Sequence, residues 1–321
     1  MVIADLGRLM HKPARGIGPF GWKEAAVRIA RFEFAALSMG LVIFGPAPCH
    51  GAEPTFDLHS PAVPQGMTVR DFSNVLIGPG DATFKVNDQV AHTMVTLNGT
   101  MLNAESYVSI GTGGLTDYLD RVLLNSMSSA FSVGDQAKVQ ISHDPLEGST
   151  IRFTKKDAAW SRELLGHAPS SDEKKAVDQL FDPQDESILY PLERIPVGYT
   201  WTVTGDSLRS LLSGGPLHFE AGFAQLTFSG VTEQLGDSCA ILDVSMHGRM
   251  RLDIEGMEGG AAFEGKGRIL RSLRSSLERL SWFRGDCVME GRWTNENGAM
   301  EMTIQGPMMM YGTNDFESKP E

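Results

Sequence analysis

The sequence has only three cysteines in 321 residues, Cys49, Cys239 and Cys287, and no two of them form a Cys-x-x-Cys pair. It also contains neither His-Glu-x-x-His nor Gly-x-Ser-x-Gly. These three motifs supply a thiol redox pair or zinc site, a metalloprotease zinc site and an exposed serine nucleophile, respectively. Their absence argues against the enzyme classes that depend on these motifs. The sequence predicts no metal and no cofactor.

Three short patterns carry reactive residue types, and each has a structural explanation. Ser171-Asp172-Glu173-Lys174 matches Ser-x-x-Lys, but its serine stands where a helix would begin and the companion motifs are missing. The glycine-rich run 111–114 lacks the following Lys-Ser/Thr of a phosphate-binding loop. His143-Asp144 is followed at once by proline, as in a turn. No catalytic residue is predicted from these patterns.

The sequence has fewer basic than acidic residues. The whole chain has 28 Lys and Arg against 40 Asp and Glu. After Ala52 the counts are 22 and 37, a net charge of −15. A nucleic-acid binder needs a basic surface that neutralises phosphates. The composition therefore argues against nucleic acid as a partner.

Long apolar runs are also missing. The longest, Phe34 to Phe44, has eleven residues, whereas a membrane-spanning helix needs roughly 20. Basic residues precede this run and small residues follow it, which is the order of a secretory signal. We therefore expect residues 1–52 to be a signal peptide, cleaved between Cys49 and Glu53. The protein is then exported, periplasmic or extracellular, and keeps no stable membrane span.

What the sequence does have is period-two alternation of apolar and polar residues, interrupted by glycine. This pattern is typical of half-buried antiparallel strands. It predicts a β-rich α+β fold, with curved antiparallel sheets forming a half-barrel or barrel-like structure and one or two short helices. The clearest alternating segments are 223–229, 249–255 and 300–304.

Two segments are predicted to be helical. Ser170 and Ser171 can cap a helix whose first turn is acidic and which ends at Asp182-Pro183. A shorter helix is expected from Asp206 to Leu212. The first helix separates two β-rich portions, so the expected organisation is 53–165, a helix and linker at 166–189, 190–312 and a polar tail at 313–321.

The segment 268–284 fits two structures. Ile269, Leu273 and Leu277 recur at helical spacing, and Gly285 stands where a helix would end, so we expect a basic amphipathic helix. The alternative is a hairpin with its turn at Ser275-Ser276. As a helix, the segment could bind anionic lipid headgroups or an envelope protein through its cationic face.

Two cysteines remain after cleavage of the signal segment. In an oxidising compartment Cys239 and Cys287 could form one disulfide. The alternation places them on unlike faces of their strands, so two inert buried thiols are the other interpretation.

Methionine is abundant, with nine of the sixteen between Met246 and Met310. Methionine fills irregular apolar contacts and is common on surfaces that accept varied hydrophobic partners. The residues predicted to contact such a ligand are Met246, Met250, Met289, Met300 and Met302.

In composition and layout, an exported acidic β-rich chain with one central helix resembles the half-barrel envelope proteins that hold lipoprotein acyl chains or other hydrophobic cargo. The resemblance implies a non-enzymatic protein that binds a hydrophobic small molecule or lipid. Two alternatives stay open. One is an envelope interaction or structural protein acting through 268–284, and the other is a hydrolase with dispersed carboxylates.

Overall fold

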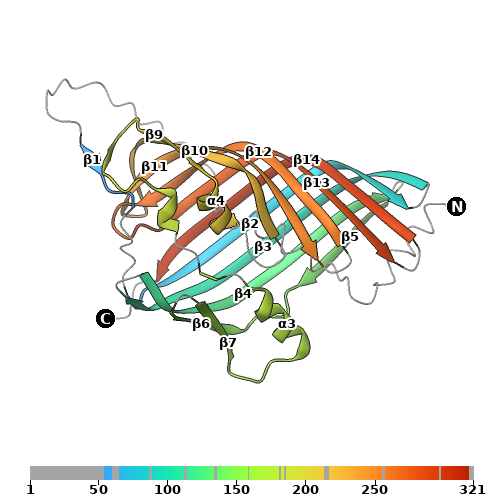
Figure 1. The fold of residues 1–321 in the computed structure, drawn as a ribbon, viewed down its shortest axis with the longest axis horizontal. Coiled ribbons are helices and arrows are strands. Elements are labelled where there is room, and N and C mark those ends of the chain that lie inside the picture. Colours follow the sequence, from blue (N-terminus) through green and yellow to red (C-terminus); the bar gives the residue numbers. More distant parts are fainter. Residues whose placement is uncertain are drawn as a thin grey trace.

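The computed structural model describes residues 54–59, 65–86, 89–111, 114–133, 136–157, 159–180, 182–183, 186–212, 217–254, 257–295 and 298–317. The expected signal peptide, residues 1–52, lies outside these ranges. Strands make up most of the described chain, and Figure 1 shows them in a strongly curved sheet. The fold class expected from the sequence is confirmed.

Most elements of the described chain are strands. In order they are β1 (Thr55–Phe56), β2 (Thr68–Val86), β3 (Gln89–Gly111), β4 (Gly114–Val133), β5 (Gln136–His143), β6 (Thr150–Lys156), β7 (Ala159–Leu165), α3 (Ser171–Gln179), the 3-10 helix η1 (Glu186–Leu189), β8 (Ile195–Pro196), β9 (Thr200–Thr204), α4 (Asp206–Leu212), β10 (Leu217–Gln234), β11 (Asp237–Ile254), β12 (Met257–Ser272), β13 (Glu278–Asn295) and β14 (Gly298–Glu317).

The two β-rich portions of the sequence form one antiparallel sheet. Its twelve described strands run in the order β7-β6-β4-β3-β2-β14-β13-β12-β11-β10-β9, with β5 also paired to β4. The portions meet where β14 pairs with β2, from Met300 opposite Val86 to Glu317 opposite Thr68. Along the described chain the sheet does not close on itself. Figure 1 shows β10 to β13 along one side of the curve and β2 to β4 along the other.

β14 extends further than the sequence indicated. The expected polar tail began at residue 313, but Thr313 pairs with Phe72 and the strand continues to Glu317. The polar side chain of Asn314 is buried, and its amide donates to the carbonyl oxygen of Glu278 at 2.8 Å. The buried amide of Asn314 is tolerated in β14 because the Glu278 carbonyl accepts its hydrogen bond.

One face of the sheet is apolar and buried, and we call it the inner face. It packs against Leu58 and against residues of η1, β8, β9 and α4, including Ile195 and Leu208. Its central side chains are Val75, Ile77, Ala82, Phe84, Val95, Leu97, Ala224, Leu226, Val244, Met246, Met250, Leu252, Ala261, Phe263, Phe283, Cys287, Met289, Met302, Ile304, Met308 and Met310.

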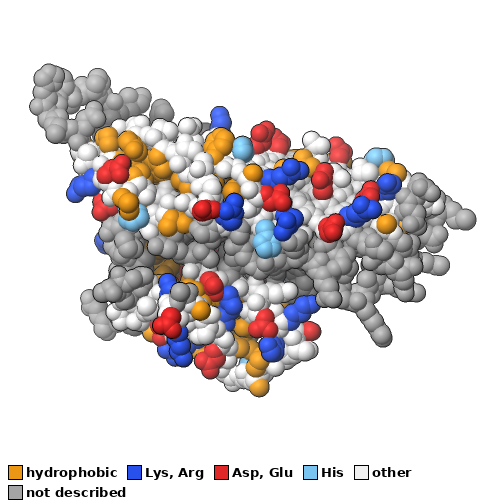
Figure 2. All heavy atoms as spheres, in the orientation of Figure 1, with side chains coloured by type: hydrophobic (Ala, Val, Ile, Leu, Met, Phe, Trp, Pro, Cys, Tyr) orange, Lys and Arg blue, Asp and Glu red, His pale blue; other side chains and the backbone are white. Residues whose placement is uncertain are grey.

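The opposite, outer face carries much of the charge. Arg268 pairs with Asp243 at 2.7 Å, and Lys85 pairs with Glu301 at 3.3 Å. Figure 2 shows acidic and basic side chains interspersed over the upper part of the molecule, where Figure 1 places β10 to β13. This division into an apolar and a charged face is the structural basis of the alternation in the sequence.

Glycines let neighbouring strands approach each other at the centre of the sheet. Gly265 and Gly285 are directly opposite each other on β12 and β13. A Cβ on Gly285 would collide with the carbonyl oxygen of Glu264, and one on Gly265 would lie 2.7 Å from the ring of Phe283. These positions therefore accept no side chain without movement of the backbone, and glycine here permits the curvature.

Both predicted helices are present. Ser170 caps α3: its hydroxyl accepts from the backbone N–H of Glu173, and the Glu173 carboxylate accepts from the backbone N–H of Ser170. Ala176 and Val177 are the buried side chains of α3 and join a second core with Tyr118 on β4 and Phe153 on β6. α4 spans Asp206–Leu212, as the sequence indicated.

The helix expected at 268–284 is wrong, and the hairpin alternative is confirmed. The segment contains the end of β12, a turn and the start of β13. In the turn, the Ser272 hydroxyl accepts from the backbone N–H of Arg274 and Ser275, and Ser276 adopts a φ of 58°. Pairing along both flanking strands outweighs the local helical spacing, so no amphipathic helix is available here.

Candidate functional site

The five predicted methionines are all buried. Met246, Met250, Met289 and Met302 belong to the inner-face core, whereas Met300, which is 7% exposed, lies outside that core near the strand end. The structure therefore brings four of the five predicted site residues to one surface.

Two of these methionines occupy the same row across the sheet. Met250 on β11 and Met289 on β13 are each directly opposite Ala261 on β12. The row continues to Ile304 on β14 and Ala82 on β2. All five side chains are buried, so the row forms an apolar stripe that runs perpendicular to the strands.

Neighbouring rows have the same character. Met246 is opposite Gly265 on β12, and Met308 is opposite Gly285 on β13. On the other side of the stripe, Met302 on β14 lies between Gly291 and Phe84. Methionine side chains are unbranched and have three rotatable bonds, so this surface can adjust to apolar partners of different shape.

Cys239 and Cys287 do not form a disulfide; both are free, buried thiols. Cys239 is opposite Ser272 on β12, and Cys287 is opposite Phe263 on the same strand. Those two positions are nine residues apart along β12, which corresponds to roughly 30 Å of strand. A disulfide requires Cα atoms within about 7 Å. Burial raises the pKa of Cys239 to about 11 and that of Cys287 to about 12.

Buried charges gather at the end of the sheet that contains the 273–277 turn. Arg271 donates from Nε to the carbonyl oxygen of Leu58 at 2.9 Å, and its guanidinium lies over the Tyr190 ring at 3.8 Å. The Tyr190 hydroxyl in turn donates to Glu278 Oε1 at 2.8 Å. The apolar centre of the inner face therefore ends at a hydrogen-bonded polar layer.

The same polar layer continues across the other half of the sheet. Asp71 on β2 is opposite Asn314 on β14 and Asn103 on β3. Asn103 donates from Nδ2 to Asp120 Oδ2 at 3.2 Å. The polar layer thus spans the adjacent strands from β12, which contains Arg271, to β4, and it lies at one end of these strands.

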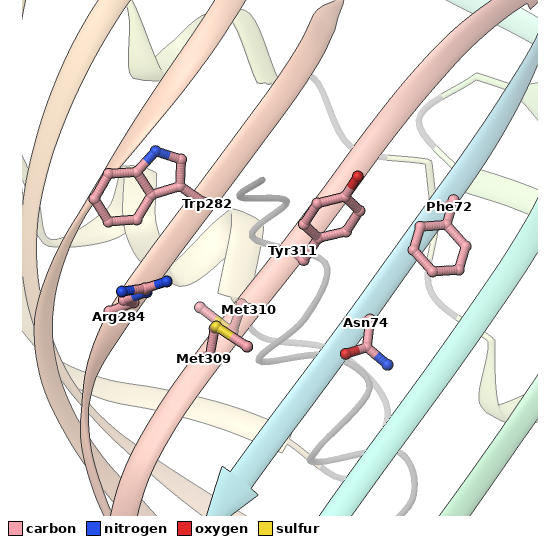
Figure 3. A pocket seen from close by; sticks show the side chains of 7 residues that line it. All are labelled: Phe72, Asn74, Trp282, Arg284, Met309, Met310 and Tyr311. Carbon is pink, nitrogen blue, oxygen red and sulfur yellow. The ribbon is translucent and has the colours of Figure 1, made fainter. Parts of the chain in front are cut away.

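A pocket of about 270 Å³ lies on the outer face, across β2, β13 and β14. Trp282, Tyr311 and Asn74 are directly opposite one another across the three strands, and Arg284 is opposite Met309. Figure 3 shows these side chains and Phe72 around the pocket. Phe72 and Tyr311 make an edge-to-face contact with ring centroids 5.7 Å apart.

These outer-face residues were not predicted from the sequence. One feature of the sequence could have indicated them: Trp282 and Arg284 are two residues apart on a strand, so an aromatic ring and a charge share one face. The partners on β2 and β14 could not have been found, because they depend on the register of strands that are distant in sequence.

No protein family matches the sequence, and no curated protein matches it. Among solved structures, the chain is similar to OccK7 (OpdD) of Pseudomonas aeruginosa, with 8% identity and a TM-score of 0.20 over 79% of this chain and 99% of that one. It is also similar to a DUF1329 family protein from Desulfovibrio piger, with 8% identity and a TM-score of 0.14 over 78% of this chain and 85% of that one. These scores carry no argument about function.

The described part of the chain contains no helix with the length and apolar character needed to cross a membrane. In the same residues, no three His, Cys, Asp or Glu side chains converge as metal ligands.

Proposed function

We propose that this protein is an exported carrier that binds a hydrophobic ligand, with an acyl lipid as the chemical class, against the inner face of its sheet. The proposal is carried by one observation: neutral, mostly apolar side chains cover the centre of the inner face across seven adjacent strands, from β10 through β14 to β2 and β3. A concave apolar surface is the usual form of a site for such ligands.

The composition of this surface favours a long, flexible ligand. Met250 and Met289 share one row, and Met246 and Met302 lie in rows on either side of it. Glycine or alanine is opposite each of the four. The small residues leave space beside each methionine, so the thioether side chain can change its rotamer with little steric cost. An acyl chain needs contact along its length and few hydrogen bonds, which this surface provides.

The polar layer at the 273–277 end gives the ligand a direction. Arg271, Glu278 and Arg279 are buried there, whereas the central rows are neutral. Burying an acyl chain over the charged residues would cost their hydrogen bonds. The ligand's apolar body is therefore placed over the central rows, with its polar group toward the layer.

An export signal is consistent with this role. A hydrophobic molecule that has to pass through an aqueous compartment needs a protein that covers its apolar surface. The basic and apolar pattern of residues 1–52 supports placement of this protein in such a compartment, the periplasm or the extracellular space.

The test is titration of the purified, delipidated protein with a fluorescent C16 fatty acid. The Met302→Gln variant replaces a thioether on the inner face by a polar amide of similar length. The matched control is Thr303→Gln, on the exposed face of the same strand. We expect Met302→Gln to weaken binding about tenfold, because the amide is desolvated by the ligand. The control is expected to bind as the parent does.

Equal affinity of the two variants, or no saturable binding by the parent protein, would contradict the proposed site. Circular dichroism of both variants shows whether each is folded before the titration is interpreted.

A further inference from the structure

The outer-face pocket has a different chemistry from the inner face, and we propose that it binds a small aromatic carboxylate. Its walls are aromatic: the Trp282 indole stands on one side and the Phe72–Tyr311 pair on the other (Figure 3). The Met309 side chain completes the outer-face lining. The volume of about 270 Å³ is near the lower limit of ordinary ligand pockets, which restricts the ligand to one or two rings.

The aromatic residues are placed by the sheet itself. Trp282 on β13 and Tyr311 on β14 are directly opposite each other, and Phe72 on β2 is opposite Thr313, two residues further along β14. Side chains of long regular strands have restricted positions, so the pocket is formed without a mobile loop. Aromatic rings stack on or pack edge-to-face against other rings, which favours a planar aromatic ligand over a flexible one.

Arg284 supplies the charge that selects a carboxylate. It is exposed on the outer face and belongs to the pocket lining. Lys266, also exposed, is directly opposite it on β12 and adds a second positive charge beside the pocket. A guanidinium matches the two oxygens of a carboxylate with two parallel hydrogen bonds. In a chain with net charge −12, this pair of cations beside an aromatic pocket favours an anionic ligand.

Asn74 supplies one oriented acceptor. Its Nδ2 donates to Asn98 Oδ1 at 2.8 Å, to the carbonyl oxygen of Gly99 at 3.0 Å and to Thr100 Oγ1 at 2.9 Å, all on β3. These bonds fix the amide with its nitrogen toward β3. In Figure 3 the Asn74 oxygen is on the opposite side, toward β14 and Met309. A hydroxyl on the ligand ring can donate to this oxygen.

The experiment compares 2-naphthoate with its neutral analogue 2-naphthamide by isothermal titration into the purified protein. The parent protein is expected to bind naphthoate about tenfold more tightly than the amide. In Arg284→Met this preference is expected to disappear, whereas the matched control Arg249→Met, which removes an exposed cation from β11, keeps it. Trp282→Leu is expected to weaken both ligands equally.

Three results would overturn the proposal. The first is no naphthoate binding by the parent protein, and the second is equal binding of both ligands, which would show an apolar patch without selectivity. The third is the same loss of preference in Arg249→Met as in Arg284→Met. Because the pocket is on the face opposite Met302, naphthoate binding is expected to be unchanged in Met302→Gln, so this test is independent of the acyl-lipid test.

Discussion

Met250 and Met289 lie on the same face of the sheet with only the methyl group of Ala261 between them. Each is directly opposite Ala261, on β11 and β13 respectively, so their backbones are roughly 10 Å apart across three adjacent strands. Their exposed fractions are 1% and 0%. The central row is therefore buried, and the small Ala261 side chain leaves the two thioethers room to change rotamer.

The first prediction concerns the stability of that row. Met289→Ala removes a fully buried side chain and leaves a cavity, so the free energy of unfolding is expected to fall by about 2–5 kcal/mol. Met309→Ala, on the outer face of β14 and partly exposed, serves as the control and is expected to cost less. Urea unfolding of both variants measures the difference. Equal losses of unfolding free energy would show that the buried Met289 side chain contributes no more to stability than the partly exposed Met309 side chain.

Strand pattern and helix ends could be predicted from the sequence because both depend on neighbouring residues. The cap of α3 needs only Ser170 and Glu173, three residues apart. The alternation in β11 shows directly which side chains are buried. The fold class followed from these local signals.

Features that depend on strand register could not be predicted. In 268–284, Ile269, Leu273 and Leu277 fit helical spacing as well as a hairpin, and the pairing of β12 with β11 and of β13 with β14 decides between them. The outer-face pocket combines Phe72 with Trp282, more than 200 positions apart in the sequence. No pattern within either strand indicates that these residues meet.

A second prediction concerns the thiols. Burial raises the pKa of Cys239 to about 11 and of Cys287 to about 12, so both are protonated at pH 8 in the folded protein. With Cys49→Ser removing the remaining cysteine, the folded protein is expected to react with Ellman's reagent only slowly. In urea without reductant, both thiols are exposed, and the protein is expected to release two equivalents of thionitrobenzoate at once. No reactive thiol in urea would instead indicate a disulfide between Cys239 and Cys287.

A third prediction concerns acid. The pKa of Glu173 is lowered to about 2, first by hydrogen bonds from Ser170 and then by His167, whose Nε2 lies 2.8 Å from the carboxylate. Because the ordinary value is 4.5, the stability gained from the ionised carboxylate is complete above about pH 4.5 and is lost as the pH falls toward 2.

The Glu173→Gln variant is therefore expected to differ from the parent protein above pH 4.5 and to converge with it toward pH 2. Urea midpoints measured across this range give the comparison. Ser170→Ala removes the main hydrogen-bond partner and is expected to reduce the pH dependence in the same way. A constant difference between Glu173→Gln and the parent from pH 2 to 6 would show that the cap does not perturb this carboxylate.

The central claim is that the inner face holds a hydrophobic ligand, and native mass spectrometry of the purified protein tests it most directly. The predicted result is a population heavier than the polypeptide by the mass of an acyl lipid, which is released on denaturation and is much reduced in Met302→Gln. The bare polypeptide mass alone, both as purified and after incubation with a C16 fatty acid, would contradict the claim.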